Sequence, residues 1–276
     1  MRPRNSRRSL ALLLGYSLAG LIIFAMLFTV LQALGLLSLL SAGGGAGAPF
    51  QTNLQGGQVR SLQIQVYGDL SIRTGPELRV ETQNAAESFR CDLQDGLLTV
   101  SSNSELSWFV NWRGIRQKVV VTLPEDLQLE EALLSAGAGD LDIDSLNVLR
   151  LTLEGGVGDA LCRRLNVAES CQLSIGVGDI DILSGQLQNL EFSGGVGDLD
   201  CAAALGGQCT IKGGVGDIDL TLLGAMGDYC IQVDNGIGDV EIDGEDVKNG
   251  VYGNSASSNT LEVSSGVGDI EIEFGY

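Results

Sequence analysis

Apolar and polar residues alternate along most of the chain after residue 58. Within Val59–Val66, for example, single polar residues separate Leu62, Ile64 and Val66, which is the two-residue period of a strand with one buried face. Beyond residue 42, no segment keeps the 3.6-residue period of a helix for 12 residues. The pattern therefore predicts an all-β protein after the N-terminal region.

A four-residue motif, Gly-x-Gly-Asp with x as Ala, Val or Ile, recurs seven times. Five of the six intervals between successive motif aspartates are 19 to 22 residues long. The sixth is 30 residues long and contains a polar insertion near Glu245–Asn259 that predicts a loop. The motifs are Gly137–Asp140, Gly156–Asp159, Gly176–Asp179, Gly195–Asp198, Gly214–Asp217, Gly236–Asp239 and Gly266–Asp269. Because one unit of about 19 residues cannot bury its apolar face alone, the period predicts a solenoid of stacked coils.

Aligning the seven units gives four columns of apolar residues. Two columns lie five and three residues before each motif, and two lie one and three residues after its Asp. We expect like positions to stack in buried rows, with Ile182, Cys201 and Leu220 as neighbours in one of them. The two Gly of each motif would occupy corners that need a positive φ or a close backbone approach. Residues 132–276 are therefore predicted to form a single-stranded parallel β-helix, a right-handed β-solenoid.

Residues 58–131 have the same strand-like texture without a regular period. Leu97–Val100 and Val119–Leu123 are typical strand segments, and Tyr67–Ile72 is a degenerate copy of the motif. We expect irregular first coils that cap the solenoid here, because terminal repeats are usually atypical. A small separate β domain is the alternative.

The order of these segments resembles the DUF4097 family of bacterial proteins. The resemblance covers most of residues 58–276 and rests on Leu62–Val66, Asp95–Val100 and Val119–Pro124, followed by the Gly-x-Gly-Asp series. It implies a β-solenoid fold, often membrane-anchored, at the cell surface. The family is also labelled as adhesins, a name inferred from its repeat architecture, and it supplies no catalytic residue. The 30-residue interval and Ser107–Trp112 depart from the family pattern.

The chain carries no charge between Arg8 and Arg60, and this region predicts a membrane anchor. Ser9–Ala42 is 34 residues long, whereas a helix needs only about 20 apolar residues to cross a bilayer. Four Arg among the first eight residues favour a cytoplasmic N-terminus. We expect a single-pass protein of the cell membrane, with a basic cytoplasmic segment (1–8), a transmembrane helix (9–42), a Gly-rich tether (43–57) and an extracytoplasmic solenoid. Ala46–Ala48 also fits a cleavage site, so a processed signal is the alternative.

Charge and composition exclude several classes of function. Asp and Glu number 35 against 16 Lys and Arg, a formal charge of −19, which argues against nucleic acid as a partner. The chain has no His, which excludes Ser–His and Cys–His catalysis and His-ligated zinc. A carbohydrate-active enzyme would need one irregular carboxylate cluster near basic residues, and Arg163-Arg164 is the only basic pair in the solenoid sequence. Carboxylates that recur in every unit indicate architecture instead, so we expect no enzymatic activity.

The motif Asp and the residue two positions later should form two outward rows of carboxylates. Charges about 4.8 Å apart repel by about 0.9 kcal/mol in water, whereas each buried apolar side chain contributes about 1.5–3 kcal/mol. Folding therefore requires no cofactor, but calcium could bind, because carboxylates and turn carbonyls are its usual ligands. The alternative is that each Asp accepts turn N–H bonds. The calcium candidates are Asp140, Asp179, Asp181, Asp198, Asp200, Asp217, Asp219 and Asp239.

Four of the six Cys fall in the inward columns, as the pairs Cys162/Cys171 and Cys201/Cys209. An extracytoplasmic location permits disulfides, and each pair could staple one turn if its Cα atoms approach within about 7 Å. Small buried thiols would fill the same positions equally well. The sequence leaves both alternatives open.

The remaining features bear on partners. Trp108, Phe109 and Trp112 could contact a glycan or an envelope protein, or could cover the core. Exposed strand edges at the solenoid ends would permit self-association, and the N-terminal helix would bind the membrane. The leading expectation is a membrane-anchored, non-enzymatic scaffold for adhesion or envelope sensing. A calcium-dependent adhesive or self-assembling repeat protein and a carbohydrate-active enzyme are the alternatives.

Overall fold

The computed structural model describes residues 50–53, 59–85, 88–102 and 116–275. The predicted anchor at residues 9–42 and the aromatic group Trp108, Phe109 and Trp112 lie outside these ranges. In the described part, no helix is long and apolar enough to cross a bilayer. Phe50–Asn53 forms strand β1 and pairs with β4 (Arg79–Gln83) in antiparallel orientation, so this part of the predicted tether is a strand.

Strands make up nearly all of the regular structure in the described ranges, together with one 3-10 turn, η3 (Met226–Asp228). The region before the regular repeats contains β1, β2 (Ser61–Val66), β3 (Asp69–Gly75), β4, β5 (Arg90–Gln94), β6 (Leu97–Ser101) and β7 (Lys118–Pro124). The repeat region contains β8 (Gln128–Ala138), β9 (Leu141–Ile143), β10 (Leu146–Val157), β11 (Ala160–Cys162), β12 (Leu165–Val177), β13 (Ile180–Ile182), β14 (Gly185–Gln188), β15 (Leu190–Val196), β16 (Leu199–Gly206), β17 (Gln208–Lys212), β18 (Ile218–Leu223), β19 (Tyr229–Ile237), β20 (Val240–Ile242), β21 (Glu245–Asp246), β22 (Gly250–Gly253), β23 (Asn259–Val267) and β24 (Ile270–Gly275).

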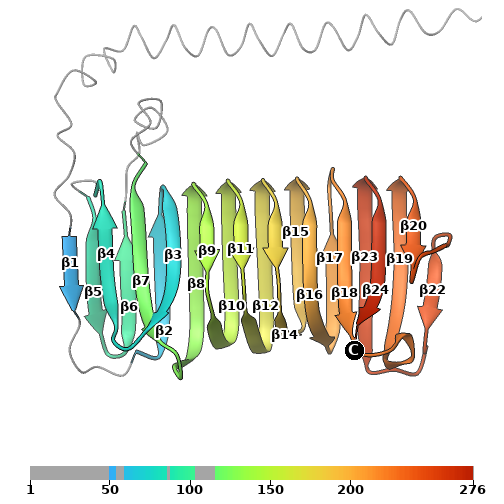
Figure 1. Ribbon diagram of the computed structural model, residues 1–276, viewed down its shortest axis with the longest axis horizontal. Coiled ribbons are helices and arrows are strands. Elements are labelled where there is room, and N and C mark those ends of the chain that lie inside the picture. Colours follow the sequence, from blue (N-terminus) through green and yellow to red (C-terminus); the bar gives the residue numbers. More distant parts are fainter. Residues whose placement is uncertain (1–49, 54–58, 86–87, 103–115, 276) are drawn as a thin grey trace, which may run out of the picture. The chain divides into compact units, whose positions relative to one another are not determined.

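Each of the first regular coils consists of one long and one short strand on different faces. The long strands β8, β10 and β12 stack in parallel in sheet B, and the three-residue strands β9, β11 and β13 stack in parallel in sheet A. β16 belongs to both sheets, since Leu199–Ala203 pairs in sheet A and Ala204–Gly206 in sheet B. Figure 1 shows the coils side by side along the longest axis. The arrangement confirms the predicted solenoid of parallel coils.

The core is a stack of apolar rows between the two sheets. Every residue of the four predicted columns is buried. The register places Ile182 opposite Cys201 and Cys201 opposite Leu220, as predicted. The alignment missed two further buried rows at the start of the long strands, because their distance from the first predicted column differs between coils: Leu151 follows Val148 by three residues, and Cys171 follows Val167 by four. One row contains Leu146 and Leu165, and the other contains Val148, Val167, Leu187 and Leu205.

The coils do not stack in sequence order at either end (Figure 1). β23 and β24, which are last in sequence, lie between β17 and β18 on one side and β19 and β20 on the other. Likewise, β2 and β3 lie between β6 and β7 on one side and β8 and β9 on the other. The expected stacking of successive units is therefore wrong for the last two, because equivalent apolar columns do not fix which coils become neighbours.

Antiparallel strands flank both ends of the described stack. At one end β5 pairs with β6 and β4 with β7, and at the other β22 pairs with β19 and β21 with β20. The insertion predicted as a loop therefore contains two short strands, β21 and β22. β21 consists of Glu245 and Asp246 only, a short and charged edge of the kind that limits strand addition. Self-association through the ends stays a prediction, and it would use these antiparallel strands and not open coil edges.

The two Gly of each motif satisfy different requirements. The second one has a positive φ in most units, such as 138° at Gly197, where an added Cβ would also lie 2.1 Å from the carbonyl oxygen of Gly178. The first one allows close approach, since a Cβ at Gly195 would lie 2.2 Å from the carbonyl oxygen of Gly176. Both contacts join consecutive coils, so the corners of the solenoid touch backbone to backbone. The predicted corner role of the motif is confirmed.

Candidate functional site

The motif aspartates form a continuous hydrogen-bonded row along one corner of the solenoid. At each step, Oδ1 of one Asp accepts the backbone N–H of the Asp in the next coil over 2.8–3.3 Å. The aspartates thus accept N–H bonds at the turns, and the donor belongs to the neighbouring coil. In spatial order the row contains Asp69, Asp140, Asp159, Asp179, Asp198, Asp217, Asp269 and Asp239.

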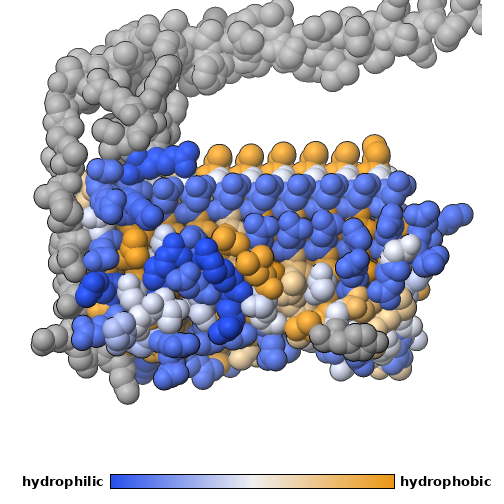
Figure 2. All heavy atoms as spheres, in the orientation of Figure 1, coloured by the Kyte–Doolittle hydropathy of each residue, from blue (hydrophilic) through white to orange (hydrophobic). Residues whose placement is uncertain are grey.

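A second row of carboxylates follows the strands of sheet A two residues beyond the first. Leu161 interrupts it between Asp142 and Asp181 and divides it into two parts. Figure 2 shows hydrophilic side chains gathered in bands along this face. In spatial order the row contains Asp142, Leu161, Asp181, Asp200, Asp219, Glu271 and Glu241.

Arginines neutralise the part of the second row that contains Asp142. Arg73 donates to Asp142 at 2.6 Å and to Asp144 at 2.8 Å, and Arg163 binds both carboxylates as well. The hydrogen bond from Arg73 is the main reason why the pKa of Asp142 lies below its ordinary value. In the sequence, Arg163 is noticeable only as half of a basic pair, and nothing marks Arg73 by itself. The degenerate motif Tyr67–Ile72 could have predicted the role of Arg73, because aligning this motif with the first full one puts Arg73 in the position of Asp144.

The part of the second row beyond Leu161 is not neutralised. Within the described ranges, no Lys or Arg forms an ion pair with Asp181, Asp200 or Asp219. Partial burial raises the pKa of all three carboxyls, and repulsion from neighbouring carboxylates raises it further. This stretch of the surface carries uncompensated negative charge.

The calcium candidates lie along these two rows and do not surround one point. In the motif row, Oδ1 of every Asp except Asp239 already accepts a backbone N–H. Among the residues that the structure describes, no group of three or more Asp, Glu or Cys side chains is placed to hold a metal ion. Calcium binding stays a prediction, and it would have to use the remaining carboxylate oxygens.

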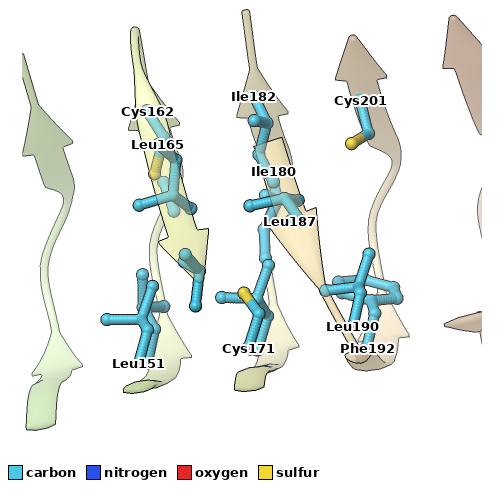
Figure 3. Packing of buried hydrophobic residues seen from close by; sticks show 14 of the residues in the cluster. Leu151, Cys162, Leu165, Cys171, Ile180, Ile182, Leu187, Leu190, Phe192 and Cys201 are labelled. Atoms are coloured by element: carbon cyan, nitrogen blue, oxygen red, sulfur yellow. The ribbon is translucent and has the colours of Figure 1, made fainter. Parts of the chain in front are cut away.

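The four inward Cys are buried and are free thiols in this structure. Cys162 and Cys201 lie in sheet A, and Cys171 and Cys209 lie in sheet B. Figure 3 shows Cys162, Cys171 and Cys201 among Leu and Ile side chains of the core. Burial raises the pKa of Cys162 and of Cys201 to about 12, so both thiols are un-ionised at neutral pH. This arrangement corresponds to the buried-thiol alternative.

An exposed apolar row lies next to the motif aspartates, at position x of the motif. Its Val and Ile side chains are 43–69% exposed. They pair from coil to coil, and Figure 2 shows a line of hydrophobic side chains directly above a hydrophilic band. Position x has no assigned role in the predicted solenoid, although an aliphatic residue beside an outward Asp in every unit is a usable signal. We name this row the aliphatic ridge, and it contains Val157, Val177, Val196, Val215, Val267 and Ile237.

Comparison with known proteins gives one family and a group of solved structures. The family model described as Toastrack DUF4097 matches residues 59–273. A candidate cell adhesion protein from Clostridium sporogenes is 19% identical, with 84% of this chain and 100% of that chain covered and a TM-score of 0.38. A candidate adhesin from Bacteroides fragilis is 13% identical (82% and 97% covered, TM-score 0.38), and a candidate lipid-binding protein from Parabacteroides distasonis is 13% identical (83% and 98% covered, TM-score 0.33). None of the curated proteins matches the chain.

Proposed function

The chain belongs to the Toastrack DUF4097 family, and on this premise we propose that it is a membrane-anchored, extracytoplasmic β-solenoid whose surface is a non-enzymatic scaffold for adhesion or envelope sensing. The charge-free run Ser9–Ala42, preceded by four Arg, supports the membrane anchor and its orientation. The recurrence of the same surface groups in coil after coil supports a binding role.

One observation carries the proposal: the hydrogen bonds that join the motif aspartates also fix the surface that they form. Oδ1 of Asp198 accepts the N–H of Asp217 at 2.8 Å, and the same contact recurs along the stack. Catalysis needs unlike groups that converge on one reacting atom. Here like groups repeat along each row, and successive groups in a row are about 4.8 Å apart, the spacing of neighbouring strands. Such a surface suits an extended partner that makes the same contact several times.

The location is tested with two reporter fusions in a bacterial host. Alkaline phosphatase and GFP are fused separately after Tyr276. Alkaline phosphatase is active only outside the cytoplasm. GFP fluoresces in the cytoplasm, but it does not become fluorescent when it is exported in unfolded form. We expect phosphatase activity without fluorescence. Deleting residues 9–42 should reverse this pattern. Fluorescence of the full-length fusion would overturn the extracytoplasmic location.

The non-enzymatic role is tested on the purified full chain with a panel of neutral and acidic envelope glycans. Retention of each glycan and release of new reducing ends are measured in the same samples. We expect no release above the blank without protein, whether or not a glycan is retained. Release that disappears in the D198N/D217N variant would overturn the proposal in favour of a carbohydrate-active enzyme.

A further inference from the structure

The aliphatic ridge is a contiguous apolar surface on a strongly acidic protein. Its members are Val157 (58% exposed), Val177 (47%), Val196 (51%), Val215 (49%), Val267 (43%) and Ile237 (69%). Single exposed aliphatic residues are ordinary on protein surfaces, but a continuous row of six is typical of a binding surface. With about 4.8 Å between coils, the row is about 24 Å long.

A strip without side chains borders the ridge toward sheet B. In the six motifs that contribute to the ridge, the first Gly precedes the ridge residue, and an added Cβ would collide with the backbone of a neighbouring coil, at 2.2 Å for Gly195 and Gly214. No other residue can therefore occupy these positions without moving the coils. The ridge and this glycine strip together offer a raised apolar edge beside a flat backbone floor. Apolar side chains of a partner could pack against both.

The motif aspartates border the ridge on the other side, toward sheet A. After residue 164 the sequence has two basic residues, Lys212 and Lys248, against 19 acidic ones. In the described ranges, neither Lys forms an ion pair with the motif row. Arg116 lies 3.7 Å from Asp69 and 3.8 Å from Asp140, at one end of the motif row. The motif aspartates from Asp159 to Asp239, which edge the ridge, have no cationic partner in the described part of the chain.

The apolar ridge and the carboxylates beside it together favour one class of partner over the others. An anionic lipid surface would be repelled by the carboxylates beside the ridge. A second copy of the chain would bring two acidic rows close to one interface, which is unfavourable for the same reason. A cationic amphipathic helix satisfies both features, because its apolar side chains can cover the ridge while its Lys or Arg face the aspartates. A helix rises about 5.4 Å per turn, so four to five turns match the length of the ridge.

We propose that the aliphatic ridge and the motif aspartates dock a cationic amphipathic helical segment of a partner, a role that rests on the proposed function for its extracytoplasmic setting. The apolar stripe of the helix packs on Val177, Val196 and Val215 and on the glycine strip. Its basic side chains pair with Asp179, Asp198 and Asp217, whose Oδ2 atoms stay free of the hydrogen bonds between coils.

The test uses the full chain in zwitterionic lipid nanodiscs and an 18-residue amphipathic Leu/Lys peptide as the probe. Binding is measured by calorimetry against empty nanodiscs. V177S/V196S/V215S removes the centre of the ridge. L183S/L223S/V251S is the matched control, because it replaces three exposed aliphatic residues outside the ridge (55%, 43% and 61% exposed). D179N/D198N/D217N removes the charge and keeps a side-chain oxygen for the bonds between coils.

We expect the ridge variant to bind at least about tenfold more weakly than the wild type, and the control variant to bind like the wild type. The Asn variant should lose most of the dependence of affinity on salt. A peptide with Ser in place of Leu should bind to none of the chains. Absence of binding to the wild type, equal binding to the ridge variant, or ridge-dependent dimers in sedimentation would each overturn the proposal, provided that circular dichroism shows equal melting of the variants.

The location experiment separates the two proposals. Fluorescence of the GFP fusion together with ridge-dependent peptide binding would reject the proposed function and keep the docking surface. Phosphatase activity together with no ridge-dependent binding would reject the docking surface and keep the proposed function.

Discussion

The backbone N–H of Asp239 donates to Oδ1 of Asp269 at 2.8 Å, so a residue 30 positions later in the sequence lies one coil nearer the middle of the stack. Asp269 in turn donates its own N–H to Asp217 at 2.8 Å. The last strands of the chain are thus held between two coils that earlier segments form. In a solenoid stacked in sequence order, the last coil would touch only one neighbour.

A chain that ends at Ser258 should therefore lose more than its last coil. The deletion leaves β19 and β20 without their parallel partners and removes a set of buried side chains. Each of them contributes about 1.5–3 kcal/mol, a large share of the 5–15 kcal/mol that is typical for a domain. We expect hydrogen exchange in residues 229–253 to lose its protection. The side chains removed are Leu261, Val263, Ile270 and Ile272.

The control for this truncation is a chain that ends at Gly275, which should keep the protection of residues 229–253. If those residues stayed protected in the shorter chain, the last strands would not support the end coil, and the interior position of β23 and β24 would be wrong.

The sequence predicts which residues form the buried rows of the core, but it does not predict which coils lie next to each other at the ends of the stack. The period places all four columns because strand alternation turns the same positions inward in every unit. It does not decide whether Val240 or Ile270 lies against Ile218, since both are apolar and in register; the structure selects Ile270. The aliphatic ridge is missed for another reason: position x lies at a corner, where alternation no longer says which side chain faces water.

Replacing Asp198 separates its hydrogen bond from its charge. D198A removes the acceptor of the Asp217 N–H, and we expect a loss of about 0.5–1.5 kcal/mol in the free energy of unfolding, measured by urea titration. D198N keeps an oxygen at the same place and removes one charge from a row of like charges, so its stability should equal or exceed that of the wild type. Equal losses in both variants would mean that the bond between coils is not why Asp recurs.

Gly197→Ala should be far more destabilising than Gly227→Ala. At Gly197, φ is 138° and an added Cβ would lie 2.1 Å from the carbonyl oxygen of Gly178, whereas at Gly227 no atom lies within 4 Å. The unusual φ alone costs about 1–3 kcal/mol, and the collision adds to it. We expect G227A to stay within about 0.5 kcal/mol of the wild type. A wild-type melting temperature for G197A, measured by circular dichroism, would contradict the contact between corners.

Calcium should stabilise the chain no more than magnesium does. Both ions screen the acidic rows, but each motif Asp except the terminal Asp239 already uses Oδ1 within the fold. We expect equal shifts in melting temperature at about 5 mM of either ion, a concentration above the dissociation constants of most extracellular calcium modules. A larger shift with calcium that is lost in D179N/D198N/D217N would support the calcium-dependent adhesive alternative.

Mild acidification from neutral pH should stabilise the chain through three carboxyls. The pKa values of Asp181, Asp200 and Asp219 are raised above the ordinary value of about 3.9. Between the ordinary and the raised values the folded chain binds more protons than the unfolded chain, so stability falls as pH rises through that window. The pKa of Asp142 is lowered instead, so its contribution is present above the ordinary value and is lost as pH falls through its folded pKa.

D181N/D200N/D219N should therefore melt at a higher temperature than the wild type at pH 7, and its melting temperature should change less as the pH falls from 7 to about 4, near the ordinary pKa of an aspartate. D142N is the opposed control: it removes the partner of Arg73 and Arg163, so it should melt at a lower temperature at pH 7. The measurement is a series of melts followed by circular dichroism at constant ionic strength. If the wild type gave as flat a profile as the triple variant, the charge beyond Leu161 would be compensated in solution, and this face would offer less attraction to a cationic partner.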